Sequence, residues 1–526
     1  MKRFLTCLVA LALMLASVSA FAYEELPEIQ FPLDTDVTLK IWMPISSSCT
    51  NRISSYAENE SFIYAQEATG IKVDFIHPSN SALSEDFNMM IVSGDLPDII
   101  VNGPYHTSSA NATSCVNGVE DGIYLDLTDY MPQYSPTYWN YINTNEEFYQ
   151  DATTPEGRVY YYTNYKNVTA EVEGSYDRFQ VRKDWLDEVG LETLRTVDDY
   201  EKYFQNILDN HPGVTPFTLV NTGIERCFTT AFYAFDDWFQ IDGVVKYGPY
   251  EDGMKDYLAL MAEWYKKGYI SPDFTSYSSE REAYLAGESG GYCGTSVDTF
   301  ELAQEIGLPI QNCPYMRVTE DQFIHGFYYL RPANGQFSVV TAESEHIAEA
   351  MMFIDYGYQV EGSYTYCYGV PGKACVYGDD GLPKYTDYIL NNPDYNMTEL
   401  SYILRFHEGF PHMRDSDAYS IPSNSQNPAC LAYRLNWMDE PNWSTSDWCL
   451  PRSLSLPNED SIRRSEIMTD IDTYRSEMVL KYITGQESVE ETFDAYQQHF
   501  RDLGIEEAIE LTQKAYDILM AKKLPD

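Results

Sequence analysis

Between residues 37 and 102, segments with the two-residue hydrophobic period of a strand alternate with segments typical of helices. Every second residue is apolar in 37–43 and in 71–75, which is typical of strands, and 98–102 predicts a third, buried strand. The intervening segments 54–69 and 81–93 predict helices, each followed by a glycine. Together they predict a β-α-β-α-β unit, which winds into a parallel sheet with right-handed crossovers.

The ends of these strands are the first candidate positions for a ligand. In open α/β sheets, ligands bind beyond the carboxyl ends of the strands. Trp42 lies at the end of the first strand and Asn102 at the end of the third. We therefore expect both residues near a binding site.

The rest of the chain predicts a second α/β region and a helical C-terminus. Thr196 and Asp199 have the spacing of a capping box at a helix start, as do Ser488 and Glu491. Further expected elements are a helix at 254–267, strands at 290–292 and 337–340, and helices at 345–356, 467–478 and 505–520. The Pro-, Ser- and Asn-rich region 420–460 predicts irregular structure.

The N-terminus has the three parts of a signal peptide. Lys2 and Arg3 are basic, residues 4–17 form an apolar run, and Ala20-Phe-Ala22 is a cleavage sequence. The apolar run is too short to anchor the chain across a bilayer. We expect residues 1–22 to be removed after Ala22 and the protein to be exported.

Charge and composition narrow the class of ligand. The 34 basic and 81 acidic residues give a formal net charge of -47, which argues against nucleic acid and anionic membrane surfaces as partners. Aromatic residues make up 15% of the chain, with 45 tyrosines. Tyrosine combines an apolar face with a polar tip, which suits polar ring-shaped ligands, although dense packing alone would also use it.

One short motif suggests a catalytic serine and another suggests a zinc site, but neither has the order or spacing that its chemistry requires. Gly287-Glu-Ser-Gly-Gly291 matches a nucleophile elbow, but a helix precedes it and a strand follows, which is the wrong order. His407 and His412 are five residues apart and not four, so they do not form a zinc pair on one helix face. We expect no catalytic residue and no metal site.

Nine cysteines remain after signal-peptide removal, so some should pair in an oxidising compartment and at least one should not. Cys367 and Cys375 flank a short glycine-containing loop that could bring them within disulfide distance. Two separate thiols are the alternative.

Several blocks together resemble the extracellular solute-binding proteins, family 1, of carbohydrate ABC transporters. The blocks that carry the resemblance are Ser93-Gly-Asp-Leu-Pro-Asp-Ile-Ile100, Tyr124-Leu-Asp-Leu-Thr128, Arg182-Lys-Asp-Trp-Leu-Asp-Glu-Val-Gly-Leu191, Gly268-Tyr-Ile-Ser-Pro-Asp-Phe274, Gly381-Leu-Pro-Lys-Tyr-Thr-Asp387, Asp470-Ile-Asp-Thr-Tyr474 and Tyr482-Ile-Thr-Gly-Gln-Glu-Ser488. Their order is similar to that of the branch that binds long oligosaccharides.

The resemblance implies an α/β, two-lobed, type II periplasmic-binding-protein-like fold with discontinuous lobes and a helical C-terminus. The expected first lobe is 23–160 with 328–400, and the expected second lobe is 161–327 with 401–526. It also implies a monomer that captures a carbohydrate, expected to be an oligosaccharide, between its lobes and delivers it to the permease subunits of an ABC transporter.

Two departures from the family pattern stand out. The loop Asp209-Asn-His-Pro-Gly-Val-Thr-Pro216 is shorter and poorer in oxygen ligands than the calcium loop of this branch, so we expect no bound calcium and no other cofactor. The chain also lacks a lipobox cysteine after the apolar run.

Alternatives to this function are a peptide or small-metabolite binder on the same fold, and a secreted glycoside hydrolase or lyase. No spacing among the 81 carboxylates singles out a catalytic pair.

Sugar rings present apolar C–H faces and a rim of hydroxyls, so a sugar site needs aromatic faces and planar polar groups. The candidate ligand-binding residues are Trp42, Asn102, Tyr105, Tyr162, Arg182, Trp238, Tyr292 and Trp437. Core packing is the alternative for the aromatic residues, and a pair with a nearby acid is the alternative for Arg182, whereas Trp185 and Trp264 are expected in the core.

Overall fold

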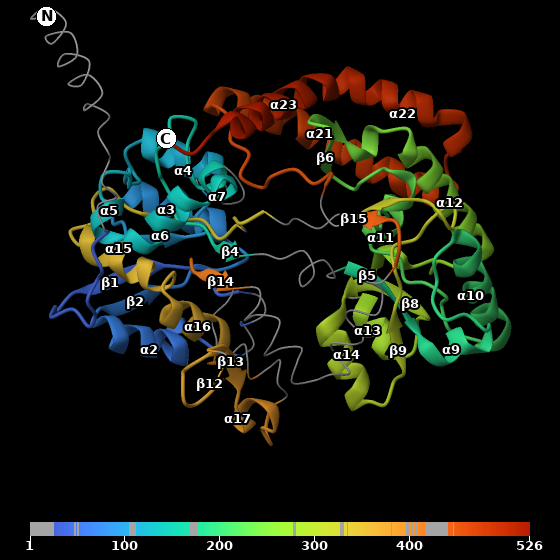
Figure 1. Cartoon of the computed structure of the whole chain (residues 1–526). Helices are drawn as coiled ribbons and strands as arrows, with labels where there is room; N and C mark the ends of the chain where they lie inside the picture. The colour runs from blue at the N-terminus through green and yellow to red at the C-terminus, as the bar shows by residue number, and fades with distance from the viewer. Residues whose placement is uncertain are drawn as a thin grey trace, which may run out of the picture.

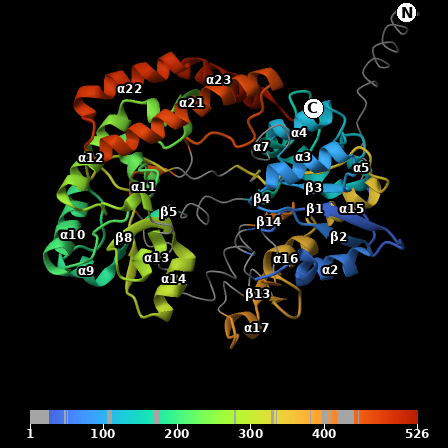
Figure 2. The ribbon, with the colours of Figure 1, turned by 180° about the vertical axis from the view of Figure 1, so that it is seen from behind.

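A computed structural model of the chain describes residues 26–525 apart from 47–48, 50–51, 105–111, 168–176, 277–279, 327–330, 334, 380, 396–399, 401–402, 405–408, 416–439 and 445–446. Figure 1 shows two lobes side by side. Each lobe has its own large hydrophobic core. The C-terminal helices α21 (Asn458–Ile483), α22 (Val489–Leu503) and α23 (Ile505–Ala521) lie over the top of the second lobe, and they reach toward the first lobe, as the view from behind also shows (Figure 2). None of the helices in the described ranges is long and apolar enough to cross a membrane.

The first lobe is built on a four-stranded sheet in the order β11-β3-β1-β2. Strand β1 (Thr38–Trp42) pairs in parallel with β2 (Lys72–Ile76) and with β3 (Ile99–Val101). Helices α2 (Glu60–Thr69) and α3 (Leu83–Ser93) connect these strands, and each ends at a left-handed glycine. The predicted parallel β-α-β-α-β unit is therefore confirmed, although the helix predicted over 54–69 is divided into η1 (Tyr56–Glu58) and α2, because Asn59 caps the start of α2.

Strand β11 (Ser338–Val340) completes this sheet from a distant part of the chain, antiparallel to β3. The other first-lobe elements are η1 (Tyr56–Glu58), α4 (Ala112–Glu120), α5 (Met131–Tyr134), α6 (Pro136–Thr144), α7 (Glu146–Ala152), β4 (Tyr165–Asn167), α15 (Ile347–Tyr356), α16 (Val360–Tyr368), β12 (Cys375–Tyr377), β13 (Pro383–Tyr385), α17 (Asp387–Leu390) and β14 (Met413–Asp415). Strands β4 and β14 pair in parallel, and Met413 packs in the first-lobe core. The predicted lobe boundaries at 160 and 400 fall just short of this pair.

The second lobe has a small sheet in which β5 (Asp177–Arg182) lies between β8 (Gly291–Thr295) and β9 (Ile310–Asn312). Its other elements are α9 (Lys183–Glu188), α10 (Val197–Asn210), α11 (Arg226–Thr229), η2 (Thr230–Phe232), β6 (Trp238–Ile241), β7 (Val244–Tyr247), η3 (Gly248–Tyr250), α12 (Gly253–Lys267), η4 (Phe274–Ser276), α13 (Glu280–Leu285), α14 (Ser296–Glu305), β10 (Ile324–His325), β15 (Trp443–Ser444), α21 (Asn458–Ile483), α22 (Val489–Leu503) and α23 (Ile505–Ala521). The predicted capping box of Thr196 and Asp199 is present at the start of α10. Trp264 and Trp185 lie in the core, as predicted.

A buried ionic cluster joins segments that connect the two lobes. The carboxylate of Asp151, on α7, is fully buried and accepts two hydrogen bonds of 3.1 Å from Arg331 Nε. Ser453 Oγ also donates to this carboxylate. Lys522, just after α23, donates through Nζ to Thr153 O, so the end of the last helix is fixed to the first lobe.

Cys227 on α11 and Cys293 on β8 form a disulfide in the second lobe. The Cys367–Cys375 disulfide that the sequence suggested is absent. Cys375 Sγ instead lies 3.5 Å from Gly369 O, and Cys367 Sγ lies 4.0 Å from Met413 O, so the loop directs the two thiols to different partners.

We predict that the Cys227–Cys293 bond supports the second lobe. It closes a sequence separation of 66 residues, and constraining such a loop stabilises a fold by about 2–4 kcal/mol. Replacing both cysteines by serine should lower the free energy of unfolding by that amount. Peptide mapping without reductant should recover the two cysteines in one linked fragment, and recovery of both as alkylated thiols would contradict this prediction.

Candidate functional site

A pocket of about 470 Å³ lies between the β6–β7 hairpin and helix α21. Its walls combine two aromatic rings, three carboxylates and two guanidinium groups. The lining residues are Asp236, Asp237, Trp238, Tyr247, Arg464, Ser465, Met468, Asp472 and Arg475.

The hairpin places the two aromatic rings of the pocket next to each other. Trp238 and Tyr247 are directly paired across β6 and β7, and their ring centroids are 4.9 Å apart. The turn between the strands is Asp242-Gly243, and both residues have positive φ, as a tight two-residue hairpin turn requires. Local turn chemistry therefore sets the register that brings the rings together.

Helix α21 supplies the other wall through one of its faces. Arg464, Met468, Asp472 and Arg475 follow a spacing of four, four and three residues, which places them on one side of a helix. Ile467 and Ile471 point instead into the hydrophobic core. The helix thus packs one stripe inward and presents a neighbouring charged stripe to the pocket.

Most charges in the pocket are already paired. Arg475 Nη1 lies 3.2 Å from Asp472 Oδ1 and donates to Tyr247 Oη at 2.9 Å, and Tyr247 Oη donates to Asp472 at 3.1 Å. Asp236 accepts two hydrogen bonds, of 3.0 and 2.9 Å, from Arg226. These contacts fix the orientation of the planar groups that a ligand would meet.

Arg464 differs from Arg475, the other basic residue that lines the pocket. Its guanidinium lies over the Trp238 ring at 5.1 Å from the centroid, and its buried Nε has no hydrogen-bond partner in the part of the chain that the structure describes. Burial lowers the pKa of Arg464 below its usual value, and desolvation raises the pKa of the neighbouring carboxyl of Asp237.

Two predicted site residues, Trp42 and Asn102, lie at the carboxyl ends of adjacent strands of the first-lobe sheet. Trp42 pairs with Ile100, so the ends of β1 and β3 are adjacent, as predicted. Trp42 is buried, with its ring 5.6 Å from that of Phe87. Asn102 is half-buried in a left-handed conformation, and its amide donates to Gln336 Oε1 at 2.8 Å.

Three other predicted residues are held by protein contacts. Tyr162 is fully buried and its hydroxyl lies 2.6 Å from Ser135 Oγ. Tyr292 is buried on β8, and its hydroxyl forms a hydrogen bond with the hydroxyl of Thr299. Arg182 donates to both carboxylate oxygens of Asp184, at 3.0 and 2.6 Å. Their contribution to a ligand site stays a prediction.

Of the remaining candidates, Trp238 lines the pocket, whereas Tyr105 and Trp437 lie outside the described residues. The sequence reasoning did not identify the residues of α21 or Asp237. The sequence does contain a signal for the α21 residues. Its charged residues recur at helical spacing, and an apolar stripe that enters the core lies next to them on the same helix.

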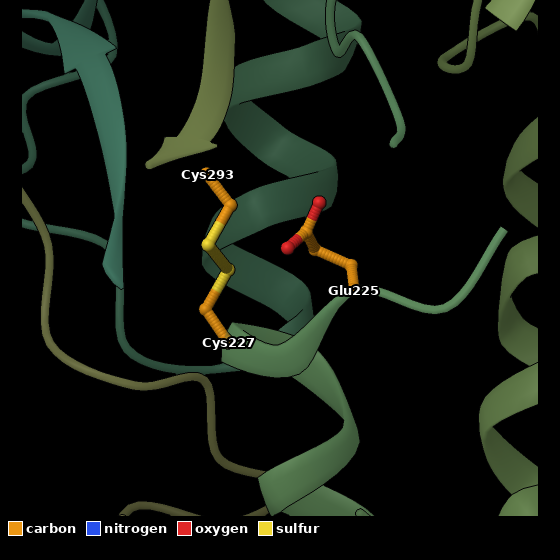
Figure 3. A group of neighbouring side chains, drawn as sticks. All are labelled: Glu225, Cys227 and Cys293. Atoms are coloured by element: carbon orange, nitrogen blue, oxygen red, sulfur yellow. A yellow bond between two sulfur atoms is a disulfide. The ribbon is translucent and has the colours of Figure 1, made fainter. Parts of the chain in front are cut away.

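One group in the described ranges has metal-ligand residue types close together. The ligand atoms of Glu225, Cys227 and Cys293 lie within 4.8 Å of one another. Figure 3 shows the Glu225 carboxyl beside the two sulfurs, which are bonded to each other. Metals bind cysteine as thiolate, so the trio does not fit a metal ion while the disulfide is formed.

A sequence model of the bacterial extracellular solute-binding proteins matches residues 51–363, so the chain belongs to this family. The family resemblance noted in the sequence is thereby confirmed. The fructooligosaccharide ABC transporter substrate-binding protein FusA of Streptococcus pneumoniae serotype 4 is 26% identical over 280 residues, which is 50% of this chain and 50% of FusA. The polygalacturonan/rhamnogalacturonan-binding protein YtcQ of Bacillus subtilis is 21% identical over 248 residues, 45% of this chain and 47% of YtcQ. The chain thus spans about half the length of the curated relatives it matches.

Solved structures support the fold over most of the chain. The alginate-binding protein AlgQ2, without calcium ion, has a TM-score of 0.72 at 19% identity and covers 93% of this chain and 100% of its own. FusA of S. pneumoniae in complex with kestose has a TM-score of 0.73 at 21% identity, over 92% of this chain and 100% of its own. The expected two-lobed α/β solute-binding fold is confirmed, and the relatives and neighbours are named as binding proteins.

Proposed function

We propose that this chain captures a carbohydrate outside the cytoplasm, between its two lobes, and delivers it to the permease of an ABC transporter. The observation that carries the proposal is the pocket at Trp238. It combines aromatic rings with carboxylate and guanidinium groups, which together match the apolar faces and hydroxyl rim of a sugar. The names of FusA and YtcQ, both carbohydrate-binding, support the same class of ligand.

In this proposal the two lobes contribute complementary parts of the site. The second lobe provides the Trp238 pocket, and the first lobe provides Trp42 and Asn102 at the carboxyl end of its sheet. The other predicted members of the proposed site are Tyr105, Tyr162, Arg182, Tyr292 and Trp437. The lobe boundaries, moved past 160 and 400 so that β4 and β14 belong to the first lobe, a monomeric state and cleavage of residues 1–22 complete the proposal.

A ligand screen tests the function directly. Fructo-, xylo-, malto- and galacturono-oligosaccharides would each be added to the purified protein while its melting temperature is measured. A ligand at 100 times its dissociation constant should stabilise the folded state by about 2.7 kcal/mol. The same samples, analysed for sugar turnover, should show none. Failure of every carbohydrate to raise the melting temperature would contradict the proposal.

Trp238→Ala should weaken binding of the selected carbohydrate by about 2–4 kcal/mol, because it removes an aromatic anchor from the pocket. Calorimetric titration would measure the loss. The matched control is Trp139→Ala, since Trp139 is also partly buried but lies on α6 in the first lobe and outside the pocket. Equal losses in the two variants would contradict a binding role for Trp238.

A further inference from the structure

A second group of aromatic residues lies in the second lobe, close to strand β6. It consists of Tyr233, Phe323, His325 and Trp448, here called the aromatic platform. Strand β10, which contains His325, pairs in parallel with β15, which shortly precedes Trp448. The platform therefore brings together three stretches of chain that are far apart in the sequence.

The rings of the platform are in contact with one another. His325 and Trp448 are stacked, with centroids 3.6 Å apart and planes inclined by 6°. Phe323 lies 5.0 Å from His325, and Tyr233 lies 5.5 Å from Trp448. On its inner side Trp448 meets the fully buried Phe235 at 6.0 Å. The platform is thus an extension of the core that reaches the surface.

Two of its rings are unusually accessible. Tyr233 is 40% exposed and Phe323 is 43% exposed. Tyr233 also has a φ of 53°, in the left-handed region that a bulky side chain rarely adopts. Tyr233 is the residue that ends η2, and its N–H donates to Thr230 O, as is common at a left-handed helix end. Its hydroxyl donates to Phe323 O at 3.0 Å, which places the tyrosine ring beside the exposed phenylalanine.

A polar rim borders the rings. His325 Nδ1 lies 2.8 Å from Asp447 Oδ2, and Ser444 Oγ donates to the other oxygen of this carboxylate. The Asp447 side chain is 46% exposed. Aromatic faces beside exposed, oriented polar groups have the same chemistry as the Trp238 pocket, and they suit a sugar better than a purely apolar partner.

The platform is continuous with the pocket through strand β6. The N–H of Gln240 donates to Trp448 O at 2.9 Å, so Trp448 lies along the strand that begins at Trp238. Only five residue steps separate Tyr233 from Trp238, which limits their Cα atoms to about 18 Å of separation. In Figure 1, β6 and β15 both lie on the side of the second lobe that faces the first lobe.

From these observations we propose that the aromatic platform is a second sugar-binding subsite, next to the Trp238 pocket. One end of an oligosaccharide occupies the pocket, and its following residues lie over Tyr233 and Phe323. The inference rests on the proposed carbohydrate-binding function, and it specifies that the ligand is a chain and not a single sugar.

A length series of oligosaccharides tests the second subsite. The mono- to hexasaccharides of whichever fructan, xylan, maltose or galacturonan series binds in the screen would be titrated into wild type, Tyr233→Asn and Phe323→Ser. Asparagine tolerates the left-handed conformation, so the first change removes the ring without adding backbone strain. Affinity of wild type should rise with chain length. Each variant should lose about tenfold in affinity for the longest chains and less than about twofold for the shortest.

Controls separate this inference from the function itself. Trp238→Ala should weaken binding at every length, and Tyr130→Asn, at an exposed tyrosine of the first lobe, should weaken none. If both platform variants match wild type at every length, the second subsite is wrong while carbohydrate binding stands. If the losses are equal at all lengths, the platform acts on the fold or on the pocket and not on the chain. If no series binds wild type, the proposed function itself is wrong.

Discussion

Replacing Trp264 by alanine should lower the free energy of unfolding by about 3–5 kcal/mol. The indole is fully buried on α12, and its ring lies 5.2 Å from Phe204 and 5.6 Å from Phe228. Its Nε1 donates to Glu201 Oε1 at 3.0 Å, so the change leaves both a cavity and a lost hydrogen bond. Urea denaturation of the whole protein would measure the loss.

The informative comparison is with Trp238→Ala. Trp238 is half-buried at the pocket, so its removal should cost clearly less folding stability than removal of Trp264 and more binding affinity. Each variant therefore needs both a denaturation midpoint and a calorimetric titration. If the two variants unfold equally easily, Trp238 is a core residue and its assignment to the ligand site is wrong.

Breaking the buried ion pair between Arg331 and Asp151 should have an effect of similar size. Arg331→Met removes the cation that donates to the fully buried carboxylate of Asp151 and leaves only the more distant charge of Lys522, and such changes cost about 3–5 kcal/mol. Burial already raises the pKa of Asp151 above its usual value. Losing the cation raises this pKa further, so the folded state of the variant binds its proton up to a higher pH than the unfolded state does. The deficit should therefore be largest at neutral pH and shrink as Asp151 becomes protonated in acid.

Two further variants give this prediction its controls. Asp151→Leu combined with Arg331→Met removes both charges and should recover much of the lost stability. Arg158→Met breaks the more exposed pair with Asp126 and should cost at most about 1 kcal/mol. A deficit for Arg331→Met that does not change between acid and neutral pH would show that lost packing, and not the buried charge, is responsible.

The sequence predicted those parts of the fold that depend on local signals. Alternation identified β1 and β2, glycines marked the ends of α2 and α3, and the capping box fixed the start of α10. The addition of β11 to the first-lobe sheet could not be predicted in the same way. Its position depends on the path of the chain through the second lobe, and no local pattern records that path.

The candidate site was harder to predict, for a physical reason visible on α21. Arg463 and Arg464 are neighbours in the sequence, but successive side chains on a helix point in different directions. Arg463 is paired with Glu507 near the surface, whereas Arg464 lies over Trp238. Similarly, nothing in the sequence distinguishes the buried Tyr162 from the exposed Tyr233. Tyrosine suits both settings, and only tertiary contacts decide between them.

The late arrival of β11 also has a consequence for biosynthesis. Ser338, which pairs with Val101, is synthesised more than 200 residues after it. At translation rates of about 5–20 residues per second, that interval lasts about 10–50 s. During this time β3 lacks the neighbour that covers its outer edge, and all three of its side chains are apolar and buried in the finished lobe. An open apolar edge strand is a template for pairing with other chains. The first lobe therefore keeps an aggregation-prone edge until residues 338–340 have been synthesised and have paired with β3.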